Sequence, residues 1–322
     1  MNKKSLIFAL FIAGISVILA LFVLNKQENH NMQNKIGGLL FEKSVTHGLG
    51  INKIIVKKPQ LQITLSLEEG FWRVKEADNY YAGLVIINSL IKTLNESKIH
   101  AVLQSDITTE MNLTSSETTK KIEPISIQTF INDKKIDDII IGSQKNNFHY
   151  ARYADSSIPL LISGNFNLPD KIHYWLQQPL ISIDIQDIET VIIQSETGQQ
   201  LAFRPEIGVP FLNVKQQPTD ISPLLEQFTS LNFIDVKTAE NTPLKDISPL
   251  KTIVLFAESG IIYSIDIYES EGSFWTRINL SSNNLPTKLA SDYIKESSFL
   301  YQNRFFKINH DIGKYLLRYS IH

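Results

Sequence analysis

The sequence predicts an α+β fold, with one N-terminal transmembrane helix followed by two duplicated α+β units that have mostly antiparallel sheets. Three observations lead to this prediction. One uncharged run is long enough to cross a bilayer, the rest of the chain alternates as strands do, and its second half repeats the element order of its first half. The implied boundaries are an anchor over residues 1–24, a polar tether over 25–38, a first unit over 39–180 and a second unit over 181–322.

The composition is that of a folded chain and excludes several kinds of function. Of the 322 residues, 43% are hydrophobic and 20% are charged, which supplies a sizeable core. The formal net charge is −2, so the chain lacks the surplus of Lys and Arg that a nucleic-acid partner requires. The absence of cysteine excludes disulfides, zinc–thiolate sites, iron–sulfur clusters, lipoprotein acylation and thiol nucleophiles.

The anchor is predicted from Leu6–Leu24, LIFALFIAGISVILALFVL, in which Ser16 is the only polar side chain. At about 1.5 Å per residue this helix spans about 28 Å, close to the ~30 Å of a hydrocarbon core. A cleaved signal peptide is the alternative. Its apolar region is normally about 7–15 residues long and ends in a small-x-small site, whereas this run continues to Leu24 without one. Retention is therefore favoured, with the lipid bilayer as the first partner.

The orientation follows from the charges that flank the apolar run. Lys3 and Lys4 precede it, so the positive-inside rule places the N-terminus in the cytoplasm. We therefore expect a single-pass protein of the bacterial inner (cytoplasmic) membrane, with the bulk of the chain periplasmic or otherwise extracytoplasmic.

The first unit is predicted to combine strands with one main helix. An amphipathic helix is expected over Ala82–Ser97, a loop over Ser105–Glu123, a turn at Asn132-Asp133 and a short helix over Asp170–Gln178. Strands are expected over Ile51–Lys57, Leu61–Leu67, Phe71–Lys75, Ile99–Gln104, Ile125–Ile131, Ile136–Ile141, His149–Tyr153 and Pro159–Ile162.

The second half repeats these segments in the same order. IETVIIQS from Ile188 matches INKIIVKK from Ile51, and QLAFRPEIGVPFLNVK from Gln200 matches QITLSLEEGFWRVK from Gln62. TIVLFAESGIIYSIDIY from Thr252 then matches SIQTFINDKKIDDIIIG from Ser126 without a gap.

Two further matches and a helix complete the repeat. FWTRI matches HYARY, which pairs Arg277 with Arg152, and the closing segments YWLQQPLISI and LYQNRFFKI also correspond. Ser222 is predicted to cap a helix that has Pro223 at its first position. Each unit is therefore expected to be a sandwich with a helix covering a mostly antiparallel sheet.

The residue pattern assigns no catalytic, cofactor-binding or metal-ligating residue. No G-x-S-x-G, P-loop, G-x-G-x-x-G, H-E-x-x-H or EF-hand motif occurs. The histidines do not pair at the spacing of local metal ligands, and His149 and His173 are expected at the surface or half-buried. The histidines lie at positions 30, 47, 100, 149, 173, 310 and 322.

Carboxylate, lysine and aromatic pairs have structural explanations that we favour over functional ones. Adjacent strand residues face opposite sides, so Asp137 and Asp138 cannot share a proton, and Asp184 and Asp187 are expected to be solvated turn residues. Glu68-Glu69 is a further carboxylate pair, and Lys57-Lys58 and Lys120-Lys121 are taken as solvated charge. Two aromatic clusters could stack on sugar rings, but packing is favoured because both are expected at equivalent positions of the repeat. They are His173-Tyr174-Trp175 and Phe274-Trp275.

A set of packing and turn positions resembles a known family. They are Leu39-Leu40, Ile51-Asn52, Trp72-x-Val74, Tyr81-Ala82, Gly142, Tyr150-x-Arg152, Pro159-Leu160-Leu161-Ile162, and Trp175-Leu176 with Leu180. With these residues the chain resembles the bacterial domain-of-unknown-function family numbered 4340 over most of residues 39–195. The resemblance implies a membrane helix and a repeated exported α+β region, in some members beside gliding-motility-type ABC exporters. It brings no catalytic residues.

We therefore expect a non-enzymatic, membrane-anchored accessory or scaffold component of an ABC-type export or envelope complex. Its expected partners are the bilayer and an ABC-type permease and ATPase or other envelope proteins, with no cofactor. The alternative is a module that binds envelope polysaccharide or peptidoglycan through Trp175 or Trp275. A hydrolase whose site is assembled from distant residues is the third and least favoured hypothesis.

Overall fold

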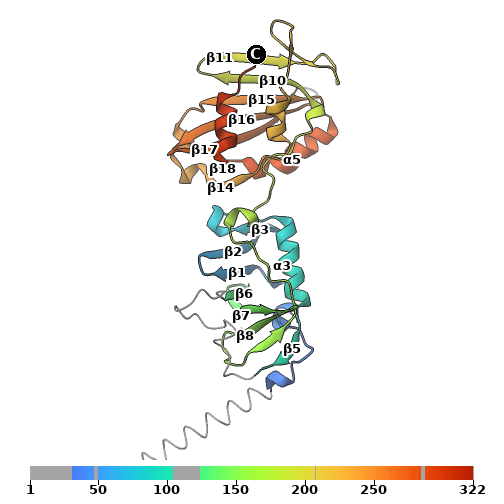
Figure 1. The fold of residues 1–322 in the computed structure, drawn as a ribbon, viewed down its shortest axis with the longest axis vertical. Coiled ribbons are helices and arrows are strands. Elements are labelled where there is room, and N and C mark those ends of the chain that lie inside the picture. The colour runs from blue at the N-terminus through green and yellow to red at the C-terminus, as the bar shows by residue number, and fades with distance from the viewer. Residues whose placement is uncertain (1–30, 47–49, 104–123, 207, 284–286, 322) are drawn as a thin grey trace, which may run out of the picture. The chain divides into compact units, whose positions relative to one another are not determined.

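The computed structural model describes residues 31–46, 50–103, 124–206, 208–283 and 287–321 (Figure 1). The predicted anchor Leu6–Leu24 and the predicted loop Ser105–Glu123 lie outside them. Over the described ranges, no helix combines the length and apolarity needed to cross a membrane. The described residues form two compact units. One comprises those within 31–70 and 85–170, and the other comprises 71–84 and those within 171–321.

The first sheet confirms the predicted strands closely. Its strands are β1 Lys53–Lys58, β2 Leu61–Glu68, β3 Phe71–Val74, β4 Tyr80–Tyr81, β5 Ile99–Val102, β6 Ile125–Ile131, β7 Lys134–Lys145, β8 Phe148–Tyr153 and β9 Leu160–Ile162. Their order across the sheet is β4-β3-β2-β1-β6-β7-β8-β9-β5, and β1 pairs antiparallel with both β2 and β6. The predicted turn at Asn132-Asp133 has positive φ at both residues, 47° and 64°, which suits a tight hairpin.

The alternation of polar and apolar residues explains the burial of this sheet. In β7, Asp137, Ile139 and Ile141 are buried, while the residues between them are only partly buried. Helix α3 (Leu84–Glu96) confirms the predicted amphipathic helix and runs beside the strands of the first sheet (Figure 1). Its buried side chains recur at helical spacing and are Ile87, Leu90, Thr93 and Leu94. A short helix, α2 (Glu42–Thr46), precedes β1.

The second sheet has the same topology as the first. Its strands are β10 Ile188–Ser195, β11 Gly198–Phe203, β12 Phe211–Asn213, β13 Pro218–Thr219, β14 Phe233–Thr238, β15 Lys251–Ala257, β16 Ile261–Ser270, β17 Ser273–Ser282 and β18 Arg304–Ile308. Their order is β13-β12-β11-β10-β15-β16-β17-β18-β14, which reproduces the order of the first sheet when β1–β9 are matched in turn with β10–β18. The α+β class and the repetition of the unit are therefore confirmed.

The strand registers agree with most of the sequence alignment. Ile54 faces Thr129 in the first sheet, and Val191 faces Leu255 in the second, as the matches from Ile51 with Ile188 and from Ser126 with Thr252 require. On the next strand pair, Arg152 faces Ile140 and Arg277 faces Asp266, so the two arginines occupy equivalent positions.

Two of the sequence matches are wrong. Gln200 faces Ile193 just as Ile63 faces Val56, so Gln200 corresponds to Ile63 and the match with Gln62 is displaced by one residue. Such a slip exchanges the two faces of a strand. The closing segments do not correspond either, because LYQNRFFKI contains β18, whose counterpart in the first sheet is β9.

The short helices also differ from the prediction. The helix expected over Asp170–Gln178 is a single 3-10 turn, η4 (Ile172–Trp175), because the chain then extends and the Gln177 amide donates to the Tyr81 carbonyl at 2.9 Å. The helix α4 (Ser222–Leu225) has Ile221 at its N-cap, so Ser222 is not the capping residue. A 3-10 turn, η6 (Glu226–Phe228), continues it.

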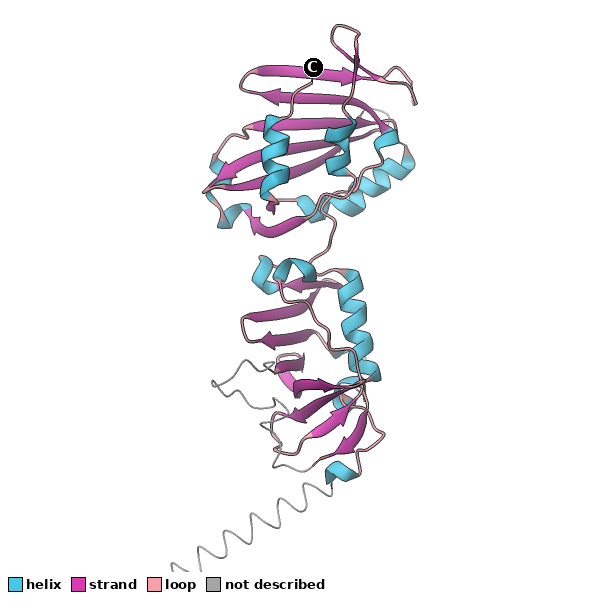
Figure 2. Ribbon diagram, viewed as in Figure 1, coloured by secondary structure: helices cyan, strands magenta, loops and turns pink. Residues whose placement is uncertain are grey.

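Two further helices pack on the second sheet. Helix α5 (Lys288–Tyr301) lies between β17 and β18, where the first unit has no helix between β8 and β9. Helix α6 (His310–Arg318), dark red in Figure 1, crosses β16 and β17 (Figure 2). Residues 71–84 give this unit Tyr80, whose ring lies 5.4 Å from Phe233 and 5.5 Å from Phe306 in edge-on contacts.

Candidate binding pocket in the second unit

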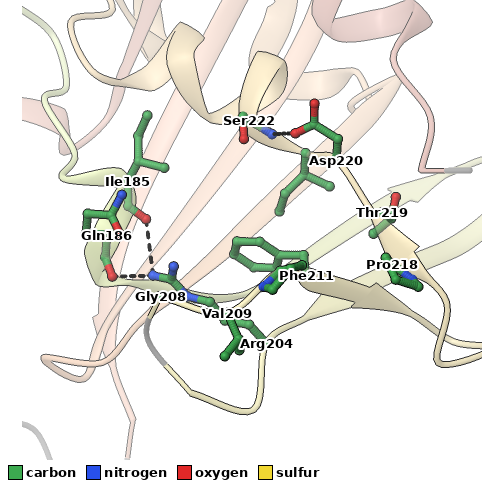
Figure 3. A pocket seen from close by; sticks show the side chains of 12 residues that line it. Ile185, Gln186, Arg204, Gly208, Val209, Phe211, Pro218, Thr219, Asp220 and Ser222 are labelled. Atoms are coloured by element: carbon green, nitrogen blue, oxygen red, sulfur yellow. Dashed lines mark hydrogen bonds between the residues drawn. The ribbon is translucent and has the colours of Figure 1, made fainter.

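A pocket of about 600 Å³ lies at the β13-β12-β11 edge of the second sheet. Its walls come from a 3-10 turn, η5 (Ile185–Asp187), from the chain around β12 and from the segment that leads into α4. The lining residues are Ile185, Gln186, Arg204, Gly208, Val209, Pro210, Phe211, Pro218, Thr219, Asp220, Ile221 and Ser222 (Figure 3). Its size is within the ~300–1,000 Å³ of small-molecule sites.

Arg204 is the only lysine or arginine among these lining residues, and its side chain is 8% exposed. Its Nη2 donates to the carbonyl of Ile185 at 3.3 Å and to that of Gln186 (Figure 3). The guanidinium also lies over the ring of Phe211, with its central carbon 5.1 Å from the ring centroid. These contacts fix the position of the positive charge against the pocket wall.

The Nε of Arg204 is buried and has no hydrogen-bond acceptor among the residues that the structure describes. A buried donor without an acceptor costs about 1–3 kcal/mol, more when the group is charged. No described carboxylate forms an ion pair with this guanidinium either. A buried charge without a counter-charge is unusual in a fold that needs it only for packing.

The carboxylate on the pocket lining is already engaged elsewhere. Asp220 accepts a hydrogen bond from the Ser222 amide at 2.9 Å. In Figure 3 this carboxylate is turned toward Ser222 and away from Arg204. The pocket therefore has a positive group on one wall, a negative group at another point, and apolar surface between them.

The pocket is built where the second unit departs from the first. The Arg204 amide donates to the Glu189 carbonyl at 2.9 Å, and the Leu67 amide donates to the Asn52 carbonyl at 2.8 Å, so Leu67 is the counterpart of Arg204. The first sheet joins β2 to β3 through the short turn 69–70, whereas in the second sheet the connection from β11 to β12 covers residues 204–210. A leucine occupies this position in the first repeat, so the strand framework that the two repeats share does not by itself require an arginine here.

The smaller pocket beside Lys251 has a structural explanation. Its Nζ donates to the carbonyls of Leu316 at 3.0 Å, Tyr319 at 2.7 Å and Leu317. The last carbonyls of a helix have no partner within the helix, and here Lys251 supplies one at the end of α6. All the hydrogen atoms of this ammonium group are therefore used by the fold.

The side chains of Asp137 and Asp138 lie on opposite faces of strand β7, as the strand geometry predicted. Asp137 is 5% exposed and accepts from the Ser44 amide at 2.9 Å and from the Ser44 hydroxyl at 2.5 Å. Asp138 points the other way and pairs with Lys135 at 2.6 Å. Asp137 ties α2 to the sheet, so it serves the fold.

The other carboxylates singled out from the sequence lie in turns. Asp184 accepts from the Gln186 amide at 2.9 Å, whereas Asp187 is bonded to Ser259, with its Oδ2 accepting from the hydroxyl at 3.0 Å. Asp187 is thus tied to the turn before β16 and is not simply solvated. Glu68 and Glu69 are both exposed where β2 ends.

Each histidine in the described ranges contacts an aromatic ring; these histidines are His100, His149, His173 and His310. His149 stands edge-on to Phe166 at 5.4 Å, and burial lowers its pKa. The His173 ring lies 4.1 Å from that of Tyr174, and its pKa is also lowered, by burial and by Lys171. In the ranges that the structure covers, no three His, Asp or Glu side chains are grouped closely enough to hold a metal ion.

Of the two tryptophans considered as sugar-stacking residues, Trp175 is fully buried and Trp275 is partly buried. Trp175 is 0% exposed, and Trp275 packs against the cluster of Leu244, Tyr268 and Phe305. They also do not occupy equivalent positions, because Trp175 is in η4 and Trp275 is in β17. The sequence prediction of equivalence was wrong, although packing is what these residues do.

The lysine pair Lys57-Lys58 is less solvated than predicted. Lys58 forms an ion pair with Asp170 and donates to the Leu168 carbonyl at 2.5 Å, and its side chain is 13% exposed. It therefore ties β1 to the end of the first unit. Lys120-Lys121 lies outside the described residues.

Sequence reasoning did not single out Arg204. No motif surrounds it, and the other pocket residues come from separate segments of the chain. The available signal was the comparison of the two repeats, in which Arg204 stands opposite an apolar residue and is followed by extra residues before β12.

Comparison with known proteins finds no match to this chain among protein-family models, curated proteins or solved structures.

Proposed function

We propose that this chain is a non-enzymatic, membrane-anchored extracytoplasmic protein that acts as an accessory or scaffold component of an ABC-type export or envelope complex. The observation that carries this proposal is the uncharged run Leu6–Leu24 with Lys3 and Lys4 before it. Such a run favours insertion, and the flanking charges favour an exported body.

The folded part supports a role in binding and assembly. Two units with the same nine-strand order give the chain a large framework of rigid antiparallel sheet. The pocket around Arg204 adds a recessed surface that belongs to one unit only. The resemblance to the family numbered 4340 supports placing this framework beside an ABC-type exporter.

Membrane topology is the first test. Alkaline phosphatase and a fluorescent reporter that matures only in the cytoplasm are fused after His322, both in the full chain and in a chain that lacks residues 6–24. The full chain should give phosphatase activity, and the deleted chain should lose it. Phosphatase activity with a mature N-terminus beyond Leu24, or fluorescence from the full chain, would contradict the anchored topology.

The second test concerns the complex. The full chain is purified from its native membranes in several mild detergents, and the co-purifying proteins are identified by mass spectrometry. An ABC-type permease and ATPase, or other envelope proteins, should be recovered in stoichiometric amounts. Recovery of the chain alone in every detergent would reject the accessory role and leave the topology result intact.

A further inference from the structure

We propose that the pocket around Arg204 binds a carboxylate that is carried on an apolar group. Two sources share this chemistry, a small branched free acid and the C-terminus of a peptide that ends in an apolar residue. The inference goes beyond the accessory role proposed above and does not depend on the partner complex.

The guanidinium has hydrogen-bonding capacity that the fold does not use. Its contacts with backbone carbonyls involve Nη2, while Nε has no acceptor in the described part of the chain. Guanidinium groups match carboxylates in planar, two-point hydrogen bonds, and such bonds are strengthened away from water. A carboxylate entering from the pocket would supply the missing acceptor after a small shift of the side chains that cover Nε.

The charge of the pocket favours a single negative charge on the ligand. Arg204 is the one cationic side chain among the lining residues, and Asp220 is an anionic one. A phosphate dianion would have only one of its two negative charges balanced by Arg204, and Asp220 would repel it more strongly than it repels a carboxylate. A carboxylate carries a single charge and is matched by the one guanidinium. The lining therefore fits a monoanion better than a phosphate.

Apolar side chains make up much of the remaining wall. Phe211 lies beside the guanidinium, and Val209, Pro210, Pro218 and Ile221 also line the pocket. Binding sites for small molecules commonly combine such a wall with a few placed polar groups. A ligand of this chemistry would keep its carboxylate at Arg204 and cover the wall with its apolar part.

The comparison of the two units is an independent argument. Leu67 occupies the position of Arg204 in the first unit, and its connection to the next strand is short. The arginine and the longer connection occur together in the second unit, and both belong to this pocket. Ligand binding explains both the arginine in place of a leucine and the longer connection to β12.

Binding is measured on the full chain in nanodiscs by isothermal titration. The small probes are 4-methylpentanoate and its neutral counterpart 4-methylpentanamide. The peptide probes are Ala-Ala-Ala-Leu with a free and with an amidated C-terminus. At least one acid should bind at least about tenfold more tightly than its amide, a difference of about 1.4 kcal/mol.

Substitutions connect binding to the pocket. Arg204→Leu should abolish the preference for the acid, and Arg204→Lys should restore it only in part, because an ammonium lacks the planar fork. Asp220→Asn should tighten acid binding by removing a negative charge. Arg277→Gln, on β17 and outside the pocket lining, is the control and should bind as the original chain does.

Each outcome decides the proposal. Preference for 4-methylpentanoate alone identifies a small free acid as the ligand class, and preference for the free-ended peptide alone identifies a chain terminus. Equal binding of acids and amides, or an acid preference that persists in Arg204→Leu, would overturn it. Should Arg204→Leu fail to fold, Asp220→Asn decides, because weaker or unchanged acid binding in that variant rejects the assignment.

Discussion

Arg204 occupies in the second unit the position that Leu67 occupies in the first. The backbone hydrogen bonds of the two residues, to Glu189 and Asn52, have the same pattern and lengths of 2.9 and 2.8 Å. A charged side chain and an apolar one are thus held by the same backbone framework. The strand framework therefore accepts either kind of side chain at this position.

Arg204→Leu should lower the free energy of unfolding by about 1 kcal/mol. The change removes the hydrogen bonds to the Ile185 and Gln186 carbonyls and the contact with Phe211, but it also removes a buried donor that has no acceptor among the described residues, which offsets part of the loss. Arg304→Leu is the matched comparison, since both side chains are 8% exposed. Arg304 donates to the Asp78 carbonyl at 3.1 Å and lies over the Tyr80 ring at 5.3 Å, so its loss should cost about 2–3 kcal/mol. Urea denaturation followed by tryptophan fluorescence measures both, and equal losses would refute the distinction.

Asp137→Ala should lower the free energy of unfolding by about 2–3 kcal/mol, because it leaves the buried Ser44 amide and hydroxyl without their acceptor. The neighbouring change Asp138→Ala removes a partly exposed ion pair with Lys135 and should cost less than about 1 kcal/mol. The same denaturation assay compares them. A larger loss for Asp138→Ala would show that the buried cluster is not what holds α2 to the sheet.

Gly313→Ala should destabilise the second unit by about 1–3 kcal/mol through overpacking. A Cβ at Gly313 would lie 2.3 Å from the Cβ and Cγ of Phe274, where α6 meets β17. Adding Phe274→Leu should recover part of the loss, whereas Lys314→Ala on the exposed side of the same helix should have little effect. Thermal unfolding by circular dichroism tests this, and an unchanged midpoint for Gly313→Ala would show that the helix can shift freely.

His149 should make the chain less stable in mild acid. Burial holds its pKa below the ordinary histidine value of about 6.5. As the pH falls below 6.5, the unfolded chain therefore takes up this proton before the folded chain does, and stability is lost until the pH passes the folded pKa. His149→Phe keeps a ring against Phe166 and should flatten this part of the pH profile. The urea midpoint is measured between about pH 5 and pH 7, on both sides of the ordinary histidine pKa. An identical pH dependence in the two proteins would rule out this contribution.

Much of the fold could be predicted from the sequence because alternation and turn chemistry act locally. The strands around Ile54 and Ile127 alternate clearly, and Asn132-Asp133 marks the hairpin between β6 and β7. The displaced match at Gln200 arose because Gln199 and Gln200 are identical in type, and only the strand register distinguishes them. Register depends on the partner strand, which a single sequence does not specify.

Helix α5 and the Arg204 pocket were not predicted, for different reasons. The buried residues of α5 are Ala290 and Tyr301, near its two ends, so its middle carries too little apolar periodicity to be recognised. The pocket is assembled from residues near Ile185, Phe211 and Ile221, and it has no local motif. The contrast between Arg204 and Leu67 depends on the strand register, which is visible in the backbone hydrogen bonds and not in the sequence.

The pairing of β1 with β6, and of β10 with β15, joins segments that are far apart in the chain. Strand β1 ends at Lys58 and pairs at once with β2, but its second neighbour, β6, begins only at Ile125, after a helix and several other strands. Closing such long loops slows folding. During synthesis, the edge of β1 that pairs with β6 therefore stays unpaired until residues 125–131 have left the ribosome, and such an edge is open to pairing with another chain.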